Sequence, residues 1–321
     1  MALLQIEDLR TEIQLKNGVV HAVDGVSLHV DEGETLGIVG ESGCGKTMTA
    51  LSIMDLLPNG GRIAGGSIKL AGREITGLPA EEIRKIRGDE IGMIFQDPLS
   101  SLNPTHTVGH QIAEVVTLHR DVSKKEAMDR AVEVLDLVGM PRARERVDEY
   151  PHQFSGGMRQ RVMIAMSLMC APRLVIADEP TSALDVTVQA QILALLRDMR
   201  AQFGTSIVLI SHDLGVVAGI AERIVVMYAG RVVESAPMRE LLRAPRHPYT
   251  ALLTQCAPSL HQPRRDRMPC LKGQPPNPSE PEIGCAFAPR CPRVSDRCRE
   301  QRPPLARIDE LCQVACHHPL P

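Results

Sequence analysis

The chain has 321 residues, 43% of them hydrophobic, which is enough for one large core and a smaller appendage. Its net charge of −3 and its 2% aromatic content give no electrostatic or stacking argument for a nucleic-acid partner. The best apolar run, Val162–Pro172, is about half of the roughly 20 residues that cross a bilayer, and Met1–Arg10 lacks the features of a secretion signal. We therefore expect a cytosolic chain with reduced cysteines, which favours metal or redox chemistry over disulfides.

Short apolar strands alternate with amphipathic helices over residues 1–240, a pattern typical of an α/β layer fold. Three apolar runs predict buried strands, at Leu36–Val39, Leu174–Ala177 and Ser206–Ile210. Two helices are also predicted. The first begins at a capping box of Ser123 and Glu126 and ends at Gly139. The second ends at Gly204 and has apolar residues at helical spacing, namely Val188, Ile192, Leu195 and Met199.

The first predicted strand leads into a glycine-rich loop that matches a phosphate-binding P-loop. Its residues are Gly40, Glu41, Ser42, Gly43, Cys44, Gly45, Lys46 and Thr47. The glycines let backbone N–H groups turn toward phosphate oxygens. Lys46 supplies a positive charge at the β- and γ-phosphates, and Thr47 supplies a hydroxyl for Mg²⁺. The loop therefore predicts ATP and Mg²⁺ as cofactors, and we interpret Cys44 as incidental.

The second predicted strand ends in two carboxylates, Asp178 and Glu179. This position places Asp178 beside the Mg²⁺ shell and directs Glu179 toward an attacking water. Combined with the preceding P-loop, the pair predicts a phosphoryl-hydrolysis site.

Between these two motifs, residues 154–158 resemble the signature motif of the ATPase subunits of ATP-binding-cassette (ABC) transporters. The family usually has Leu-Ser-Gly-Gly-Gln there; this chain has Phe154, Ser155, Gly156, Gly157 and Met158. The family's Q-loop, D-loop and switch histidine are matched by Gln96, by residues 182–185 ending in Asp185, and by His212. The resemblance covers essentially the whole chain.

The resemblance implies an α/β fold, a P-loop (RecA-like) ABC nucleotide-binding domain over residues 1–242. A helical subdomain is expected at about residues 97–165, and a Cys/Pro-rich C-terminal extension over residues 243–321. Two cassettes of this family close head-to-tail over two ATP molecules, so Ser155, Gly156 and Gly157 would contact the partner's nucleotide. By the same resemblance, Glu179 polarises water, His212 fixes that geometry, and Gln96 joins the Mg²⁺ shell and reports nucleotide state to membrane subunits.

The family commonly stacks adenine on an aromatic side chain before the P-loop, and here no Phe, Tyr or Trp precedes Phe95. We expect His21, Val19 or a backbone surface to take that place, with weaker stacking than an aromatic ring gives.

The last part of the chain differs in composition. Fifteen of the 24 prolines lie between Pro245 and Pro321, so long helices are not expected there. Such a segment cannot easily fold alone and needs a staple, for which the cysteines are the obvious candidates. Seven of the nine cysteines lie after residue 240, and four of them are separated by five, six and seventeen residues: Cys285, Cys291, Cys298 and Cys316.

These four cysteines are open to three interpretations. The preferred one is a [4Fe–4S] cluster, because four thiolates in a loop-rich segment suit it and some members of one branch of the ABC family carry one at this spacing. Structural Zn²⁺ is an alternative that usually uses ligand pairs two to four residues apart. The third is packed, unliganded cysteines. Cys312 could replace Cys316 as fourth ligand, and Cys270 is a spare thiol. We expect a structural role, so that Cys291→Ser weakens the fold of the extension and leaves Lys46-dependent ATP binding in place.

Residues 247–253 and 284–292 resemble the tail of dipeptide and oligopeptide importers, as do residues 93–98, 101–104 and 227–230. The resemblance implies a motor for peptide import at the cytoplasmic face of the cytoplasmic membrane. Its partners would be a second, different ABC ATPase in a heterodimer, two transmembrane permease subunits and an external solute-binding protein, with no nucleic acid. The alternatives are the same motor for nickel, glutathione or an opine, a soluble non-transport ABC ATPase, and a regulatory subunit with a dead site.

Overall fold

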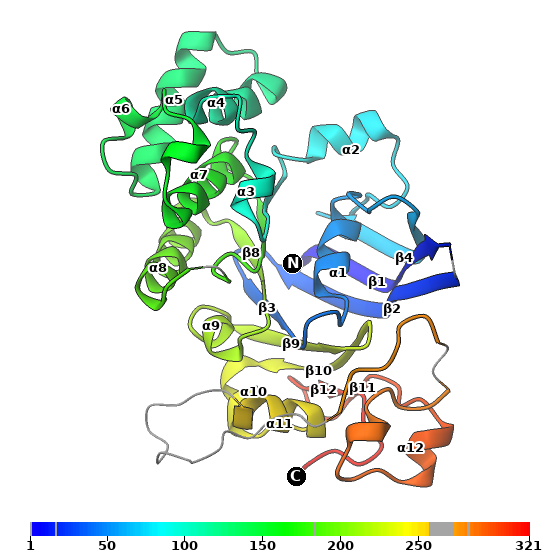
Figure 1. The fold of residues 1–321 in the computed structure, drawn as a ribbon. Helices are drawn as coiled ribbons and strands as arrows, with labels where there is room; N and C mark the ends of the chain where they lie inside the picture. The colour runs from blue at the N-terminus through cyan, green and yellow to red at the C-terminus, as the bar shows by residue number, and fades with distance from the viewer. Residues whose placement is uncertain (1, 17, 183, 257–272, 281–282) are drawn as a thin grey trace. The chain divides into compact units, whose positions relative to one another are not determined.

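The computed structural model describes residues 2–16, 18–182, 184–256, 273–280 and 283–321 (Figure 1). Cys270 and Ala183 of the predicted D-loop lie outside these ranges. The chain divides into two compact units. Unit 1 comprises Asp31–Glu34 and Gly77–Leu209, and unit 2 comprises Ala2–Val30, Thr35–Thr76 and Ile210–Pro321. The predicted domain boundary at residue 242 stays a prediction.

Unit 1 combines two parallel strands with a group of helices. β6 (Ile91–Ile94) pairs with β7 (Leu174–Asp178), and β7 is buried along its whole length, as predicted for Leu174–Ala177. The helices before β7 are α2 (Ala80–Ile86), α3 (Pro98–Ser101), α4 (Val108–His119), α5 (Lys124–Leu137), α6 (Ala143–Arg146), η1 (Pro151–Gln153) and α7 (Gly156–Leu168). α8 (Val186–Phe203) follows β7, and β8 (Ser206–Ser211) continues from unit 1 into unit 2.

Helices α4, α5, α6 and α7 of unit 1 pack on one another. α5 contacts α4, α6 and α7, and the group is visible as the green helices of Figure 1. The predicted capping box is confirmed, because Ser123 Oγ accepts from the Glu126 N–H while the Glu126 carboxylate accepts from the Ser123 N–H. The glycine stop is confirmed as well, since Gly139 has a φ of 72°.

The helix predicted to end at Gly204 is confirmed as α8, with Gly204 at a φ of 66°. Its buried side chains are Ile192, Leu196 and Met199. Leu195, which the apolar spacing assigned to the buried face, is half-buried, so that assignment was wrong by one position.

Unit 2 contains a four-stranded sheet in the order β2-β1-β4-β5. These strands are β1 (Ala2–Leu15), β2 (Gly18–Asp31), β4 (Gly61–Leu70) and β5 (Arg73–Glu74). A second group of strands in this unit runs in the order β11-β12-β10-β9-β3, with β3 and β9 parallel and the other pairs antiparallel. Its members are β3 (Thr35–Val39), β9 (Arg223–Tyr228), β10 (Arg231–Pro237), β11 (Ala306–Arg307) and β12 (Gln313–Val314). β3 is buried throughout, as predicted for Leu36–Val39.

The helices of unit 2 are short. They are α1 (Lys46–Ile53), α9 (Leu214–Ala218), α10 (Met238–Arg243), α11 (Pro248–Cys256), η2 (Ala288–Arg290) and α12 (Asp296–Glu300). In the described part of the extension the longest, α11, has nine residues, so the prediction of no long helix is confirmed there. No helix of either unit, within the described ranges, has the length and apolarity needed to cross a membrane.

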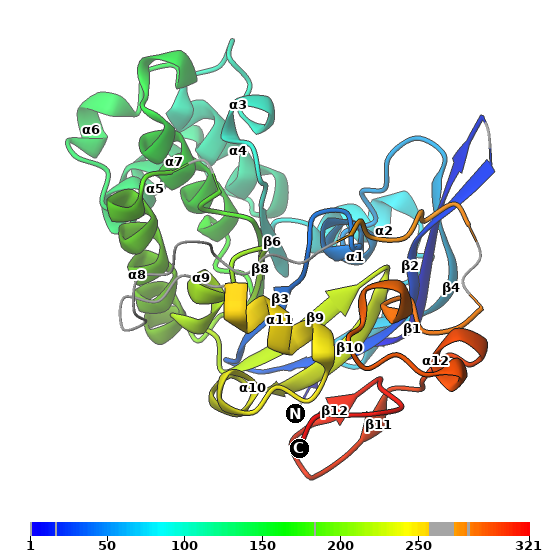
Figure 2. The same ribbon diagram turned by 60° about the horizontal axis from the view of Figure 1, so that its bottom comes forward.

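The C-terminal extension is joined to the sheet by backbone pairing and by an aromatic cluster. β12 pairs with β10, with Val314 opposite Glu234, and the red hairpin of β11 and β12 lies beside β10 in Figure 2. Tyr228 of β9 packs against Tyr249 and Phe287, with ring centroids 4.7 and 5.3 Å away, and all three side chains are at most 1% exposed. The expectation that the cysteines are the staple was therefore incomplete, because these contacts also bury the extension.

Candidate functional site

Residues 40–47 lead from β3 into the first turn of α1 in unit 2, as the sequence predicts for a P-loop. Gly45 has a φ of 100° before the helix, and a Cβ there would lie 2.5 Å from a backbone oxygen of β2. Only glycine satisfies both conditions. Lys46 is buried, and its Nζ donates to the backbone oxygens of Gly40 at 2.7 Å and Glu41 at 3.0 Å. The loop thus encloses an ammonium group at a helix N-terminus, an arrangement that attracts phosphate.

The other loop residues differ in exposure. Ser42, Gly43 and Thr47 are exposed, so the Thr47 hydroxyl is accessible to a nucleotide and its metal ion. Cys44 is 5% exposed, and burial raises the pKa of its thiol. This protonated, buried sulfur agrees with the interpretation of Cys44 as an incidental packing residue.

A cavity of about 320 Å³ opens beside the P-loop within unit 2. Glu41–Cys44 line it, together with His21 of β2 and Pro275–Pro278 of the extension. The His21 N–H donates to the backbone oxygen of Pro278 at 3.0 Å, and its Nδ1 lies 3.4 Å from the Glu12 carboxylate. Two side chains were expected near adenine. His21 lines this cavity, and Val19 is not among its described lining residues.

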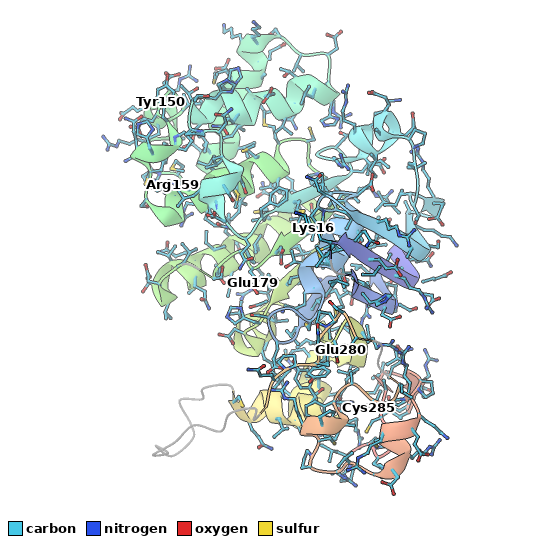
Figure 3. All side chains as sticks on the ribbon, turned by 45° about the vertical axis from the view of Figure 1, so that its right-hand side comes forward. Lys16, Tyr150, Arg159, Glu179, Glu280 and Cys285 are labelled. Atoms are coloured by element: carbon cyan, nitrogen blue, oxygen red, sulfur yellow. The ribbon has the colours of Figure 1, made fainter. Side chains whose placement is uncertain are left out.

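The two predicted carboxylates lie at the end of β7 in unit 1. Asp178 is 2% exposed, and Glu179 has a φ of 47°, a left-handed conformation that residues with a side chain rarely adopt. Such backbone strain concentrates at functional sites. Gln96 Nε2 donates to Glu179 Oε2 at 3.2 Å, so the structure brings together two predicted site residues 83 positions apart. Figure 3 labels Glu179.

The predicted signature residues form the start of α7 in unit 1. Ser155 is its N-cap, with Oγ accepting from the Met158 N–H at 3.4 Å, and Gly156 and Gly157 are its first two helical residues. Ser155 and Gly156 are exposed. The segment therefore presents a hydroxyl and the positive end of a 13-residue helix to solvent, which suits an anionic ligand.

The departure from the usual motif at Phe154 has a structural explanation. Phe154 is 3% exposed, and the Arg146 guanidinium carbon lies 5.8 Å from the centre of its ring. Its side chain belongs to the core of unit 1, where Leu and Phe serve the same purpose, so it does not occupy the exposed face that Ser155 presents.

The D-loop and switch residues are also at element boundaries. Asp185 is the N-cap of α8 and accepts from the Thr187 and Val188 N–H groups, both at 3.0 Å. His212 follows β8 in unit 2 and is exposed. Unit 1 thus holds Gln96, Ser155, Gly156, Gly157, Asp178, Glu179 and Asp185, and unit 2 holds Gly40–Thr47 and His212.

Two residues of the extension contact the P-loop, and no sequence pattern predicted either contact. The Glu41 N–H donates to Tyr249 Oη at 2.9 Å. Arg290 donates from Nη1 and Nη2 to the two carboxylate oxygens of Glu41, at 2.6 and 2.9 Å. These partners are 208 and 249 positions apart in the chain, too far for any local pattern to reveal.

The four predicted cluster cysteines line one small cavity in unit 2, with His317, His318 and Phe287 among its other walls. Cys312 is not among its described lining residues, so the structure favours Cys316 over Cys312 as the fourth member. Burial, together with Cys285, Cys291 and Cys298, raises the pKa of Cys316 to about 11. Figure 3 labels Cys285 in this part of the chain. In the described ranges, no group of three or more Cys, His, Asp or Glu residues is arranged to hold a metal ion.

Comparison with known proteins places this geometry in a family. The family model of the ABC transporter matches residues 23–182, and that of the oligopeptide/dipeptide transporter C-terminal region matches residues 233–298. The chain is 50% identical over 315 residues to the oligopeptide transport ATP-binding protein AppD of Bacillus subtilis, covering 98% of this chain and 96% of that protein. It is also 50% identical to the oligopeptide transport ATP-binding protein OppD of Escherichia coli, covering 99% and 94%.

A solved structure confirms the predicted fold class. An ATP-binding cassette in a dimeric post-hydrolysis state, bound to ADP and Pi, is 28% identical and superposes with a TM-score of 0.67, covering 74% of this chain and 99% of that one. The prediction of an ABC ATPase fold with a peptide-transporter-type extension therefore agrees with both comparisons. The chain belongs to the family of ABC transporter ATP-binding subunits, in its oligopeptide and dipeptide branch.

Proposed function

We propose that this chain hydrolyses ATP to energise the import of di- and oligopeptides, as one ATPase subunit of a multi-subunit ABC importer. The proposed ATPase activity rests mainly on the Glu179 carboxylate, which accepts a hydrogen bond from Gln96 at the end of a buried strand. The same chain has a complete P-loop. The peptide class rests on relatives that are oligopeptide transport ATP-binding proteins and are half identical to this chain along almost its whole length.

The nucleotide is bound first by the P-loop. Its backbone N–H groups and Lys46 bind the phosphates, because the loop already surrounds the ammonium group with backbone oxygens that phosphate oxygens can replace. Thr47, Gln96 and Asp178 would hold Mg²⁺ through hydroxyl, amide and carboxylate oxygens, the ligand type that this ion prefers, and the ion would offset the phosphate charge.

Glu179 then acts as the base that polarises the attacking water. The hydrogen bond from Gln96 orients this carboxylate, and a carboxylate can accept the proton of the water. His212 fixes the geometry of the water and the γ-phosphate, and Asp185 orders the start of α8. Catalysis of this kind depends mainly on positioning and charge stabilisation.

The signature residues act on the nucleotide of a partner. Ser155, Gly156 and Gly157 lie at an exposed helix N-terminus, and the related cassette was solved as a dimer. The partner proposed here is a second, different ABC ATPase. Two transmembrane permease subunits and an external solute-binding protein complete the importer. The chain itself would lie peripherally at the cytoplasmic face of the membrane.

The four-cysteine cavity is proposed to hold a [4Fe–4S] cluster. Three of the four sulfurs accept or share a local hydrogen bond: Cys291 from the Arg293 N–H at 3.4 Å, Cys316 from the His318 N–H at 3.3 Å, and Cys298 with Ser295 Oγ at 3.4 Å. Hydrogen bonds to sulfur are one of the means by which proteins stabilise such clusters.

The spacing of the four cysteines argues against a single zinc ion. Structural zinc usually takes its ligands in pairs two to four residues apart, whereas these cysteines are separated by five, six and seventeen residues. Four thiols that line one cavity in a loop-rich segment are the ligand type of a [4Fe–4S] cluster, which supports the proposal.

Two experiments test these proposals. In vesicles containing the complete importer, ATP-dependent uptake of a labelled peptide should be lost with Lys46→Ala, and uptake of nickel or glutathione in place of peptide would contradict the peptide assignment. Anaerobically purified chain should show broad absorption near ~400 nm, bleached by dithionite, and about four iron atoms per chain. One zinc ion and no colour would instead contradict the cluster.

A further inference from the structure

We propose that Arg290 of the C-terminal extension is a positioning residue of the P-loop. Nucleotide affinity would therefore depend on the fold of residues 285–291, the cysteine-bounded turn that contains Arg290. The proposal rests on the ATPase function proposed above, and it does not require that the cysteines bind iron.

The contact between Arg290 and Glu41 has the geometry of a specific ion pair. The two guanidinium nitrogens donate to the two carboxylate oxygens at 2.6 and 2.9 Å, a parallel fork that is stronger and more directional than a single contact. The Arg290 side chain is 4% exposed and that of Glu41 25% exposed, so water screens the pair far less than it screens a surface pair.

Neighbouring groups of the extension and of β9 fix both partners. Arg290 Nη1 also donates to Tyr228 Oη at 3.2 Å, and its guanidinium carbon lies 5.8 Å from the centre of the Tyr228 ring. Tyr249 Oη accepts from the Glu41 N–H. The extension thus holds Glu41 through its side chain and through its backbone.

Glu41 transmits this restraint to the phosphate site. Its backbone oxygen accepts from Lys46 Nζ, so a shift of Glu41 moves an acceptor of the lysine that binds phosphate. Its carboxylate is also a negative charge within a loop that must bind a polyanion. Arg290 neutralises that charge, and without Arg290 the carboxylate would repel the nucleotide and leave a half-buried charge unpaired.

The position of Arg290 itself depends on the fold of the cysteine-bounded turn. Arg290 ends η2 and directly precedes Cys291, while the Cys285 N–H donates to the backbone oxygen of Cys298 at 2.7 Å and the Ala288 N–H to that of Cys285 at 2.9 Å. A change that moves the backbone of Cys285 or Cys291 should therefore also move Arg290. This replaces our expectation that Cys291→Ser leaves ATP binding in place.

The test is a double-mutant cycle on the Kd of ATP, measured by calorimetry on the purified full-length chain. Arg290→Gln should weaken binding about tenfold, since it leaves Glu41 charged and unpaired. Arg290→Lys should restore part of that loss. The double variant Glu41→Gln with Arg290→Gln should return to within about twofold of wild type, because no unpaired charge remains.

Controls separate positioning from folding and from the proposed function. Arg299→Gln removes another arginine of the extension, which pairs with the exposed Asp296, and should leave the Kd unchanged. Lys46→Ala should abolish binding; if wild type itself bound no ATP, the ATPase proposal would fail, not only this one. Iron content and circular dichroism of each variant report whether the extension still folds.

A second set of variants tests whether the affinity for ATP depends on the cysteine-bounded turn. Cys291→Ser should weaken ATP binding in the wild-type background and have little effect in the Glu41→Gln, Arg290→Gln background, where the charge that needs positioning is absent. The proposal is overturned if Arg290→Gln binds ATP as tightly as wild type while folded, if the double variant is no tighter than Arg290→Gln alone, or if Cys291→Ser has equal effects in both backgrounds.

Discussion

The side-chain amide of Gln96 donates a hydrogen bond of 3.2 Å to the carboxylate of Glu179, a residue whose backbone is held at a φ of 47°. The bond joins the segment that follows β6 to the end of β7, two parallel neighbours in unit 1. It therefore fixes the orientation of a carboxylate whose backbone conformation is itself strained. Both constraints suit the role proposed for this carboxylate, which is to polarise the attacking water.

Replacement of Glu179, the proposed base, gives the first prediction. Glu179→Gln keeps the size of the side chain and removes its ability to take a proton. We expect kcat for ATP hydrolysis to fall by about 10²- to 10⁴-fold, while the Kd for ATP changes little. Steady-state turnover of the assembled transporter and calorimetric ATP binding measure the two quantities. Glu145→Gln on exposed α6 is the matched control, and near-normal turnover of Glu179→Gln would rule out Glu179 as the base.

The signature serine gives a prediction that separates the chain's own nucleotide from its partner's. Ser155→Ala should leave ATP binding by the isolated chain intact and lower hydrolysis by the assembled transporter. It also removes the cap of α7, at a cost of about 1 kcal/mol. Ser155→Asn supplies a matched control, because Asn caps helices equally well but lacks the hydroxyl. If Ser155→Asn turned over normally, the hydroxyl would have no part in the partner's site.

Phe154 gives a prediction about stability. Its ring is buried in unit 1 beside Arg146, so Phe154→Ala should lower the free energy of unfolding by about 3–5 kcal/mol. Phe154→Leu, which restores the residue usual in the family, should cost less than about 1.5 kcal/mol. Urea denaturation of the three proteins measures both values. Equal stability of Phe154→Ala and Phe154→Leu would contradict a packing role.

Much of the site was predictable because its motifs are local. The P-loop is marked by glycines within eight residues, and the capping box by Ser123 and Glu126, three residues apart. The proposed base is marked by a carboxylate at the end of an apolar strand. In each case the chemistry and the backbone constraint lie in one short segment, so the sequence alone predicts them.

The contacts of the extension were not predictable for the opposite reason. Arg290 and Glu41 are 249 positions apart, and β12 has only two residues, too few for an alternating pattern. The cysteine spacing predicted that the cysteines stabilise the extension. The burial of Tyr228, Tyr249 and Phe287 depends instead on tertiary packing, which composition does not encode. Leu195 and Leu196 show the same limit on a smaller scale, since two adjacent leucines offer two helical registers.

His247 gives a pH-dependent prediction for the extension. Its ring is 1% exposed, its Nδ1 accepts from the Tyr249 N–H at 3.0 Å, and burial lowers its pKa to about 4 from an ordinary value near 6.5. Between these values the unfolded chain binds a proton that the folded chain excludes. Stability should therefore fall as the pH falls from about 6.5 to about 4, by roughly 3 kcal/mol.

Glu234 must be separated from this effect, because it accepts from the His247 N–H at 2.8 Å and burial raises its pKa. A raised carboxyl pKa acts in the opposite sense, since the folded state then binds the extra proton as the pH falls. His247→Asn keeps an acceptor for the Tyr249 N–H and does not titrate. The difference in unfolding free energy between wild type and His247→Asn, measured from pH 7 to pH 4, cancels the contribution of Glu234. A difference that stays constant over that range would show that His247 is not held in its neutral form.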